Sequence, residues 1–501
     1  MKNRWTILVL LFSCSRCWGQ ADNLHASLEA QAVFISDHDN VPFWMRSDRF
    51  GSVPLPGTSA SFLAAASKDY SPQAGLVDWG ASVLLRADVG SSSRVTLIEG
   101  FVKARFSIFQ FRAGRIREFT GLVDSTLSSG AFAISGNALG IPKVQLSIPE
   151  YWSPPIFGNL FAFKGNFDYG WLGEDSIQYT RYADHSKLYY HQLSFWGRLG
   201  KPNWRLKLYG GFTHQVQWGD ERSIYGPKFL LTPFKTFQYA VMGKTYLGSK
   251  IGNHIGSIDL AMGYDLGNVT VSLYRQNFYD EGALSKLANI ADGLNGISLT
   301  NKEYRKAESV PDYYPVLGDV NPPFQWHKVV LELFYSKNQA GYPWSKPTNS
   351  GDENYYNNFE YYQGWSYKGQ GLGNPFVTPA YTTRSGFPNS RGDYFNNNRV
   401  MAFYGAIEGS VYNYRFVARG SYSLNYGTFG TSPWGHTTGS PANYTPVPKY
   451  NQFKEVNQLS GSLEVTRDLD NGWQAGCMAG LDYGNLFYHS AGLILSIRRG
   501  F

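Results

Sequence analysis

The sequence predicts an all-β fold, a closed transmembrane barrel of antiparallel strands, from its last strand, its strand-length runs and its composition. From Gly492 onward, Leu493, Leu495 and Ile497 lie on one face and alternate with small or mixed residues on the other. The chain then ends on Phe501, which has the same parity as these three apolar residues. A strand between lipid and a lumen alternates in this way, because successive side chains point to opposite faces. On this stretch alone, an edge strand of a soluble β-protein would look the same.

A terminal aromatic residue on the lipid face is typical of the closing strand of bacterial outer-membrane barrels. We therefore expect Phe501 at the periplasmic edge of the membrane. Arg499 departs from the usual pattern, because it occupies a lipid-side position where a second aromatic residue is expected. A charge is tolerated there, since the cost of a basic residue on the lipid face is small near the interface.

The N-terminus, residues 1–19, is interpreted as a secretory signal peptide. Lys2 and Arg4 precede the apolar run 5–12, which is too short to span a bilayer as a helix. Cleavage near Gly19 would leave residues 20–501 as a single outer-membrane barrel domain. The alternative is a lipobox at 11–14, with Cys14 as the lipidated residue.

The composition sets further bounds. Loss of residues 1–19 removes three basic residues and no acidic one, so the formal charge falls from +7 to +4, too little to indicate nucleic-acid binding. Only Cys477 remains of the three cysteines, which excludes a disulfide within the mature chain. Hydrophobic residues make up 43% and aromatic residues 16% of the chain, yet its mean hydropathy is negative. Alternating strands, aromatic girdles and long polar loops average to such values.

Strand-length runs of about ten residues recur along the chain. About seventeen are found, and a barrel with both ends in the periplasm needs an even number, sixteen or eighteen, so the weak run 178–183 could supply one more. The runs are 26–36, 80–89, 94–103, 105–116, 143–148, 159–168, 187–198, 204–214, 236–247, 257–266, 268–277, 327–337, 399–411, 412–426, 458–467, 472–483 and 486–497.

Three long connections separate the runs. In 281–293, Leu284, Leu287, Ala288 and Ala291 share one helical face, which predicts a short amphipathic helix. The segments 301–326 and 339–398 are predicted to be long irregular loops. Sixty irregular residues would be unusual in a compact soluble domain, but extracellular loops of this length are normal on a barrel.

Several motifs occur together in a characteristic order: FWMRSDRFG, then AGR followed by LSSGAFAISGNALGIPKVQLSIP, then GNHIGSIDLAMGY, and finally YYNNFEYYQGWSYKGQGLGNP. In this order they resemble the capsule-assembly Wzi family of outer-membrane proteins, in particular its Bacteroidetes-type members. The resemblance runs from about residue 40 to the C-terminus. It implies an outer-membrane barrel of about eighteen strands whose extracellular side binds capsular or exopolysaccharide, and it supplies no catalytic residue.

The loop 339–398 is rich in aromatic residues interleaved with amides. Flat rings beside amide donors and acceptors suit sugars, which present apolar C–H faces and hydroxyl groups. The alternative is that these rings form the internal contacts of a large loop. The candidate glycan platform consists of Trp344, Tyr355, Tyr356, Tyr361, Tyr362, Trp365 and Tyr367.

The sequence contains no recognisable catalytic, nucleotide-binding or zinc motif. No cofactor or metal is therefore expected. The leading hypothesis is a non-enzymatic outer-membrane lectin that attaches polysaccharide to the cell surface; the alternative is a porin or export channel for saccharides, and an enzyme embedded in a barrel comes third. Further expected partners are outer-membrane lipids and the barrel-assembly machinery.

Overall fold

The computed structural model describes residues 23–36, 40–71, 75–280, 283–302, 323–340, 353–390, 392–435 and 446–501. The predicted signal peptide 1–19, the alternative lipobox and Trp344 lie outside these residues. No helix in the described ranges is both long and apolar enough to cross a membrane.

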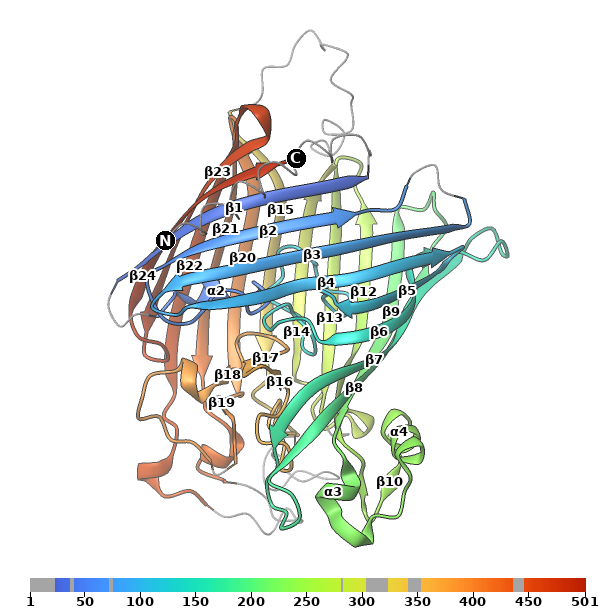
Figure 1. Ribbon diagram of the computed structural model, residues 1–501, viewed down its shortest axis with the longest axis vertical. Coiled ribbons are helices and arrows are strands. Elements are labelled where there is room, and N and C mark those ends of the chain that lie inside the picture. Colours follow the sequence, from blue (N-terminus) through green and yellow to red (C-terminus); the bar gives the residue numbers. More distant parts are fainter. Residues whose placement is uncertain are drawn as a thin grey trace, which may run out of the picture.

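The chain forms a closed antiparallel barrel of 18 strands (Figure 1). Each strand pairs with the next barrel strand along the chain, and β1 pairs with β24 to close the sheet. A closed barrel leaves no sheet edge, as a membrane-spanning sheet requires. The barrel strands are β1 (Leu24–Ile35), β2 (Ser59–Lys68), β3 (Val77–Gly90), β4 (Arg94–Phe106), β5 (Phe109–Arg115), β6 (Pro142–Trp152), β7 (Phe161–Ser176), β8 (His185–Leu199), β9 (Leu206–Trp218), β12 (Asn253–Asp265), β13 (Val269–Tyr279), β14 (Gly293–Asn301), β15 (Gln325–Tyr335), β20 (Val400–Val411), β21 (Tyr414–Asn425), β22 (Val456–Asp468), β23 (Trp473–Gly484) and β24 (Ser490–Gly500).

The facing predicted for the closing strand is confirmed. Leu495, Ile497 and Phe501 are exposed on the outer face, whereas Ile494 is buried on the inner face. The guanidinium of Arg499 lies over the rings of Trp473 and Phe501, at 5.3 and 5.1 Å from their centroids. The two rings thus hold the one charge that breaks the aromatic pattern.

The structure corrects several of the predicted elements. The run 236–247 is not a barrel strand, since it contains most of helix α4 (Pro233–Val241) and the short strand β10 (Thr245–Tyr246). Strands β2 and β14 were not predicted, and residues 178–183 lie in a loop. The helix expected at 281–293 is reduced, within the described residues, to a 3₁₀ turn, Ala283–Lys286, because β14 already begins at Gly293.

The short elements all lie in the loops. They are the helices α2 (Phe43–Arg46) and α3 (Glu221–Tyr225), the 3₁₀ turns Gly226–Lys228, Ala380–Thr382, Phe429–Thr431, Lys449–Asn451 and Asp470–Gly472, and the small hairpins formed by β10 with β11 (Ser249–Lys250), β16 (Ser366–Tyr367) with β17 (Gln370–Gly371), and β18 (Thr378–Pro379) with β19 (Phe395–Asn397).

The two ends of the barrel differ. The turns 107–108, 266–268 and 412–413 lie at the end that holds Phe501, which we call the terminal end. The connections 36–58, 116–141, 219–252, 336–399 and 426–455 lie at the opposite end, the loop end. Outer-membrane barrels have short periplasmic turns and long extracellular loops, so we expect the loop end to be the extracellular one. The segment 301–326 joins β14 to β15 at the terminal end, so the two long predicted loops lie at opposite ends of the barrel.

Candidate functional site

Three segments from the loop end fold back into the barrel. They are 40–58, which carries α2, then 116–141, and the described part of 339–398. Their buried side chains share one hydrophobic core with inward-facing residues of the wall, including Tyr190, Phe278 and Phe334. We call these three segments together the plug.

The first plug segment is attached to β21 and β23. The backbone N–H of Phe43 donates to Asp482 Oδ2 at 2.9 Å, and Trp44 Nε1 donates to Ser421 Oγ at 2.9 Å. The Trp44 ring also packs against Tyr404 of β20, with ring centroids 4.9 Å apart. These polar contacts fix α2 against the inner wall, because each buried donor has a partner there.

The second plug segment is attached to the wall at β12, β13 and β15. The backbone N–H of Leu122 donates to Asp259 Oδ2 at 2.8 Å, and that of Ser129 donates to Glu332 Oε2 at 2.7 Å. Phe132 donates its N–H to Gln276 and stacks on Phe278, with ring centroids 4.1 Å apart.

A continuous row of rings connects these two attachments. Its members, in order, are Phe487, Phe43, Phe376, Phe334, Phe278 and Phe132, with neighbouring centroids between 4.1 and 5.9 Å apart. The row runs from the loop between β23 and β24 to the wall at β13 and β15. Close-packed apolar side chains therefore occupy the loop half of the lumen along this line.

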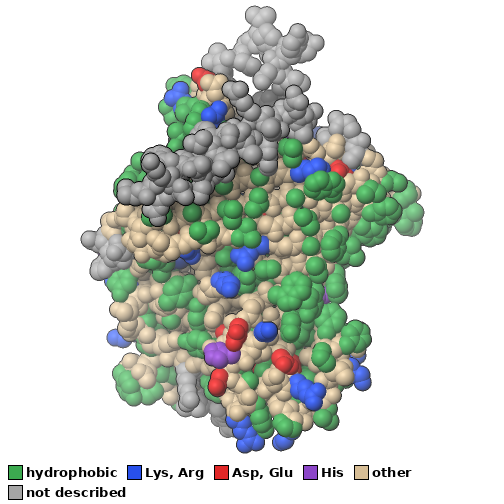
Figure 2. Space-filling view, in the orientation of Figure 1, with side chains coloured by type: hydrophobic (Ala, Val, Ile, Leu, Met, Phe, Trp, Pro, Cys, Tyr) green, Lys and Arg blue, Asp and Glu red, His purple; other side chains and the backbone are tan. Residues whose placement is uncertain are grey.

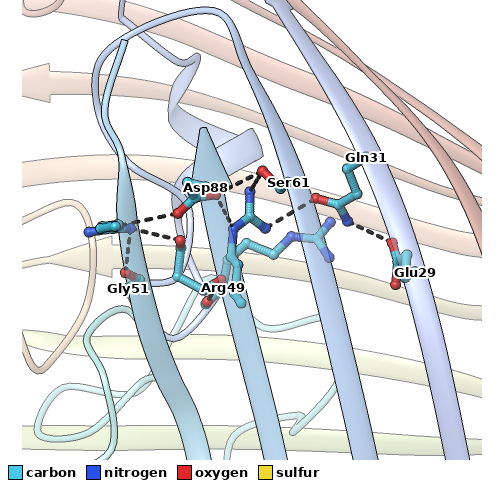
Figure 3. A network of polar contacts seen from close by, with 9 residues as sticks. Glu29, Gln31, Arg49, Gly51, Ser61 and Asp88 are labelled. Carbon is cyan, nitrogen blue, oxygen red and sulfur yellow. Dashed lines mark hydrogen bonds and ion pairs between the residues drawn. The ribbon is translucent and has the colours of Figure 1, made fainter. Parts of the chain in front are cut away.

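Charged residues line the inner wall beside the plug (Figure 3). Arg86, which is almost fully buried, donates to Asp88, Ser61 and Gln31. Arg94 forms an ion pair with Asp88 and donates to the backbone oxygens of Gly51 and Ser52 of the plug. This network ties the first plug segment to β2, β3 and β4.

A cavity of about 330 Å³ remains beside this network. Its charged lining includes Glu29, Arg49, Arg86, Arg117, Glu464 and Arg498. Arg49 pairs with Glu464, Arg86 with Asp88, and Arg117 with Glu99. One arginine of the wall and two of the plug are thus compensated by carboxylates of the barrel strands. Within the described ranges, no group of three or more His, Cys, Asp or Glu side chains is arranged to hold a metal ion.

The structure places the candidate glycan residues mostly in the plug interior. Tyr355, Tyr356, Tyr361, Trp365 and Tyr367 are buried, while Tyr362 is exposed and Trp344 lies outside the described residues. A buried ring offers no face to a sugar, so the expected exposed platform is not found at these five positions. They correspond to the alternative, in which the rings form the contacts of the loop itself.

The buried rings also use their polar atoms internally. Trp365 Nε1 donates to the backbone oxygen of Ala133 at 2.7 Å, and the Tyr355 hydroxyl donates to Asp292 at 2.6 Å. The Tyr361 hydroxyl donates to Glu221 Oε1 of α3 at 2.7 Å. Composition could not reveal this role, because rings that bind sugars and rings that bind the rest of the loop need the same polar neighbours.

A smaller aromatic group is exposed at the loop end. Tyr362 is 43% and Tyr381 50% exposed, and both rings lie beside Tyr394, at centroid distances of 5.8 and 6.4 Å. The Tyr394 hydroxyl donates to the backbone oxygen of Gly369, which fixes its ring. We call Tyr362, Tyr381 and Tyr394 the tyrosine patch. Sequence reasoning missed Tyr381 and Tyr394, since each is a single tyrosine in a polar stretch.

Two buried carboxyl groups join the plug to α3 near this patch. Burial, followed by the charge of Glu221, raises the pKa of Glu360 to about 8. The Tyr225 hydroxyl donates to Glu360 Oε2 at 3.3 Å, and Tyr361 donates to Glu221. A carboxyl whose folded pKa is raised favours folding in its neutral form, so its contribution is greatest below the unfolded pKa of 4.5 and falls as the pH rises toward 8.

We therefore expect the contact between α3 and the plug to loosen as the pH rises from about 4.5 to about 8. Amide hydrogen exchange of peptides spanning Tyr361, corrected for intrinsic exchange rates, should become faster across this range. Glu360→Gln should flatten the dependence, because the amide cannot ionise. Equal protection of the wild-type peptides at both ends of the range would contradict this assignment.

Comparisons with known proteins agree with the barrel. No family model and no curated protein matches the chain. Among solved structures, Wzi of Escherichia coli, an outer-membrane protein involved in group 1 capsule assembly and a carbohydrate-binding β-barrel, is 13% identical, with a TM-score of 0.53 over 98% of this chain and 87% of its own. At this identity the likeness shows the fold alone. This chain is an outer-membrane β-barrel.

Two further solved structures are more distant. OccD3 of Pseudomonas aeruginosa is 11% identical, with a TM-score of 0.42 over 96% of this chain and 91% of its own. OccAB2 of Acinetobacter baumannii is 11% identical, with a TM-score of 0.44 over 96% of this chain and 98% of its own.

Proposed function

We propose that this barrel is a non-enzymatic, lectin-like protein that attaches capsular or exopolysaccharide to the cell surface and so takes part in capsule assembly. The proposal includes membership of the Wzi family in its Bacteroidetes-type form, with the barrel-assembly machinery as the partner during biogenesis. The observation that carries it is the combination of a plugged lumen with exposed rings at the loop end. A plugged barrel is suited to be an anchor, and its surface is then the part that meets a ligand.

The tyrosine patch is the proposed glycan site. Tyr362 and Tyr381 expose ring faces, and Gln363 follows Tyr362 directly in the chain as a hydrogen-bond donor. Aromatic faces flanked by polar donors match the alternating apolar and hydroxyl surfaces of a sugar. Of the seven residues that the sequence singled out, Tyr362 alone has an exposed ring among the described residues.

The porin or export-channel alternative requires an open path through the lumen. The row of rings from Phe487 to Phe132 and the hydrogen bonds of the plug to β12, β13, β21 and β23 oppose it. Purified protein in a planar bilayer is therefore expected to show no stable open channel. A sustained conductance from the wild-type protein would favour the channel and overturn the anchor.

Replacing Tyr362 and Tyr381 together by alanine should weaken glycan binding by at least about 2 kcal/mol, because binding energy usually concentrates in a few aromatic anchors. That is roughly a thirtyfold loss of affinity, measurable on arrays of bacterial polysaccharides. The cells should still make polysaccharide but release it into the medium.

Tyr450→Ala is the matched control, because Tyr450 is an exposed tyrosine at the same end but on a separate 3₁₀ turn. Its substitution should leave the binding curve unchanged. Trp365 is unsuitable for this test, since its loss would disturb the plug itself. If the double variant keeps its affinity and its surface polysaccharide, the patch is not the glycan site; polymer that accumulates inside the cell would instead assign the protein to export.

A further inference from the structure

One loop-end segment lies outside the barrel. Residues 226–252, which we call the flap, carry α4 and the hairpin of β10 and β11 between β9 and β12. Figure 1 shows these elements beside the wall at the edge of β8 and β9. The Phe237 ring of α4 packs against Tyr169 of β7, His191 of β8 and Trp218 of β9, with centroids 5.8, 6.4 and 6.0 Å away.

The wall beneath the flap faces outward. His191 has the parity of the exposed Leu193 and Phe195, and His254 has the parity of the exposed Ile258 and Leu260. Both histidines are nevertheless buried, as are Val216 and Trp218 of β9. The flap therefore covers part of the lipid-facing surface where that surface meets the loop end.

Polar side chains explain why this part of the wall needs a cover. His214 Nε2 lies 3.3 Å from His254 Nδ1, and His214 Nδ1 lies 2.9 Å from the Tyr279 hydroxyl. His191 Nδ1 lies 2.7 Å from the backbone oxygen of Asp168. Exposed to hydrocarbon, imidazoles on the outer wall would be unfavourable, so the flap takes the place that lipid holds elsewhere on the barrel.

The flap is strongly basic. Residues 226–252 contain Lys228, Lys235, Lys244 and Lys250 and no Asp or Glu, so they carry a formal charge of +4 in a chain whose net charge is +7. All four lysines are exposed. An anionic surface would complement this charge, and a basic or neutral one would not.

The flap also exposes large apolar side chains. Leu230, Phe234, Met242 and Leu247 are between 62 and 80% exposed, whereas Phe229 and Ala240 on its inner side are buried against the wall. Figure 2 shows hydrophobic and basic side chains together on this corner of the molecule. Apolar side chains interleaved with lysines are typical of segments that lie in a membrane interface.

We propose that the flap docks on the outer leaflet, with its exposed apolar side chains in the interface and its lysines on the phosphate groups of anionic lipids. The flap is continuous with the lipid-facing wall, which places it next to the head groups of that leaflet. Thr232 and Pro233 begin α4 with a side-chain cap and a pre-set backbone, so the flap keeps its shape before it meets lipid. The docking fixes the height and tilt of the barrel relative to the outer leaflet.

An environment-sensitive fluorophore on a single cysteine tests the docking. The full-length protein carries Cys477→Ser, because Cys477 is exposed, and Met242→Cys in the flap. It is reconstituted into vesicles of phosphatidylcholine, of phosphatidylcholine with phosphatidylglycerol, or of phosphatidylcholine with purified lipid A. Asn389→Cys, an exposed site on the plug, is the matched control.

We expect the label at 242 to be quenched by nitroxide-bearing lipid and protected from iodide in water, with the opposite result at 389. The wild-type protein should bind phosphatidylglycerol and lipid A more tightly than phosphatidylcholine. Converting the four lysines to glutamine should reduce this preference. Each lysine removed should change that preference about fivefold at low salt, and added salt should diminish it. Heat-modifiable migration of the variants verifies that the barrel has folded.

Three results would overturn the proposal. The label at 242 could be as accessible to iodide as the label at 389, which would place the flap in water. The lysine-to-glutamine variant could retain the same lipids as the wild type, which would remove the role of the phosphates. Disulfide-linked dimers through the cysteine at 242 would assign the face to a second copy of the chain. None of these outcomes depends on glycan binding.

Discussion

Replacement of Trp44 by alanine is expected to destabilise the plug by about 3 to 5 kcal/mol, because it removes the apolar contacts of a fully buried side chain and leaves a cavity. The ring packs between Tyr404 of the wall and Phe376 of the third plug segment, and its N–H is bonded to Ser421. Its loss should release 40–58 from the wall. Trypsin should then cleave after Arg46 or Arg49, and a planar bilayer should show ion conductance that the wild type lacks.

Trp44→Phe is the control for this prediction, because it keeps an aromatic ring while it removes the hydrogen bond to Ser421 and part of the indole. It should cost less, about 1 to 2 kcal/mol, and the planar bilayer should show no conductance. If Trp44→Ala resists trypsin and conducts no better than the wild type, the other two plug segments fill the lumen by themselves.

The side-chain facing of the strands could be predicted because period-two alternation records it directly. Leu495 and Ile497 are apolar because they face outward, and this facing does not depend on the conformation of the loops. The predicted number of about seventeen strands is close to the observed 18 partly by compensation of errors. One predicted run is not a barrel strand, and two of the observed strands were not predicted. Strand β2 reads SASFLAAASK, in which alanine and serine carry almost no hydrophobic contrast. Strand β14 contains two glycines and directly follows a loop.

The false strand shows what β-propensity measures. Residues 236–247 are rich in aromatic and β-branched side chains, which favour a pleated and half-buried surface. Helix α4 offers a half-buried surface too, because one side packs on the outer wall and the other is exposed. Only the barrel beneath it, assembled from distant strands, decides between the two, so the sequence of the segment could not.

The candidate site was harder to predict than the wall for a related reason. In an irregular loop no period indicates which way a ring points. Tyr361 and Tyr362 are neighbours in the sequence, yet the first is bonded to Glu221 in the interior and the second is exposed. The Tyr361 ring is directed by its contact with α3 and the Trp365 ring by its contact with the second plug segment, and both partners are more than a hundred residues away in the chain.

Replacing Leu495 by lysine should destabilise the folded barrel by about 2 to 4 kcal/mol, because it places a charge on the lipid face near the middle of β24. Ser496→Lys, one residue further, is the matched control: Ser496 lines the inner cavity together with Glu29 and Glu464, so a lysine there meets water and carboxylates. Urea unfolding of both variants in lipid vesicles, followed by heat-modifiable migration, measures the difference. The closing strand must pair with β1 to remove the last free edge of the sheet. A charge on its outer face therefore opposes both the insertion of the strand and the closure of the barrel. If the lysine at 496 prevented folding and the lysine at 495 did not, the inner and outer faces of this strand would be interchanged.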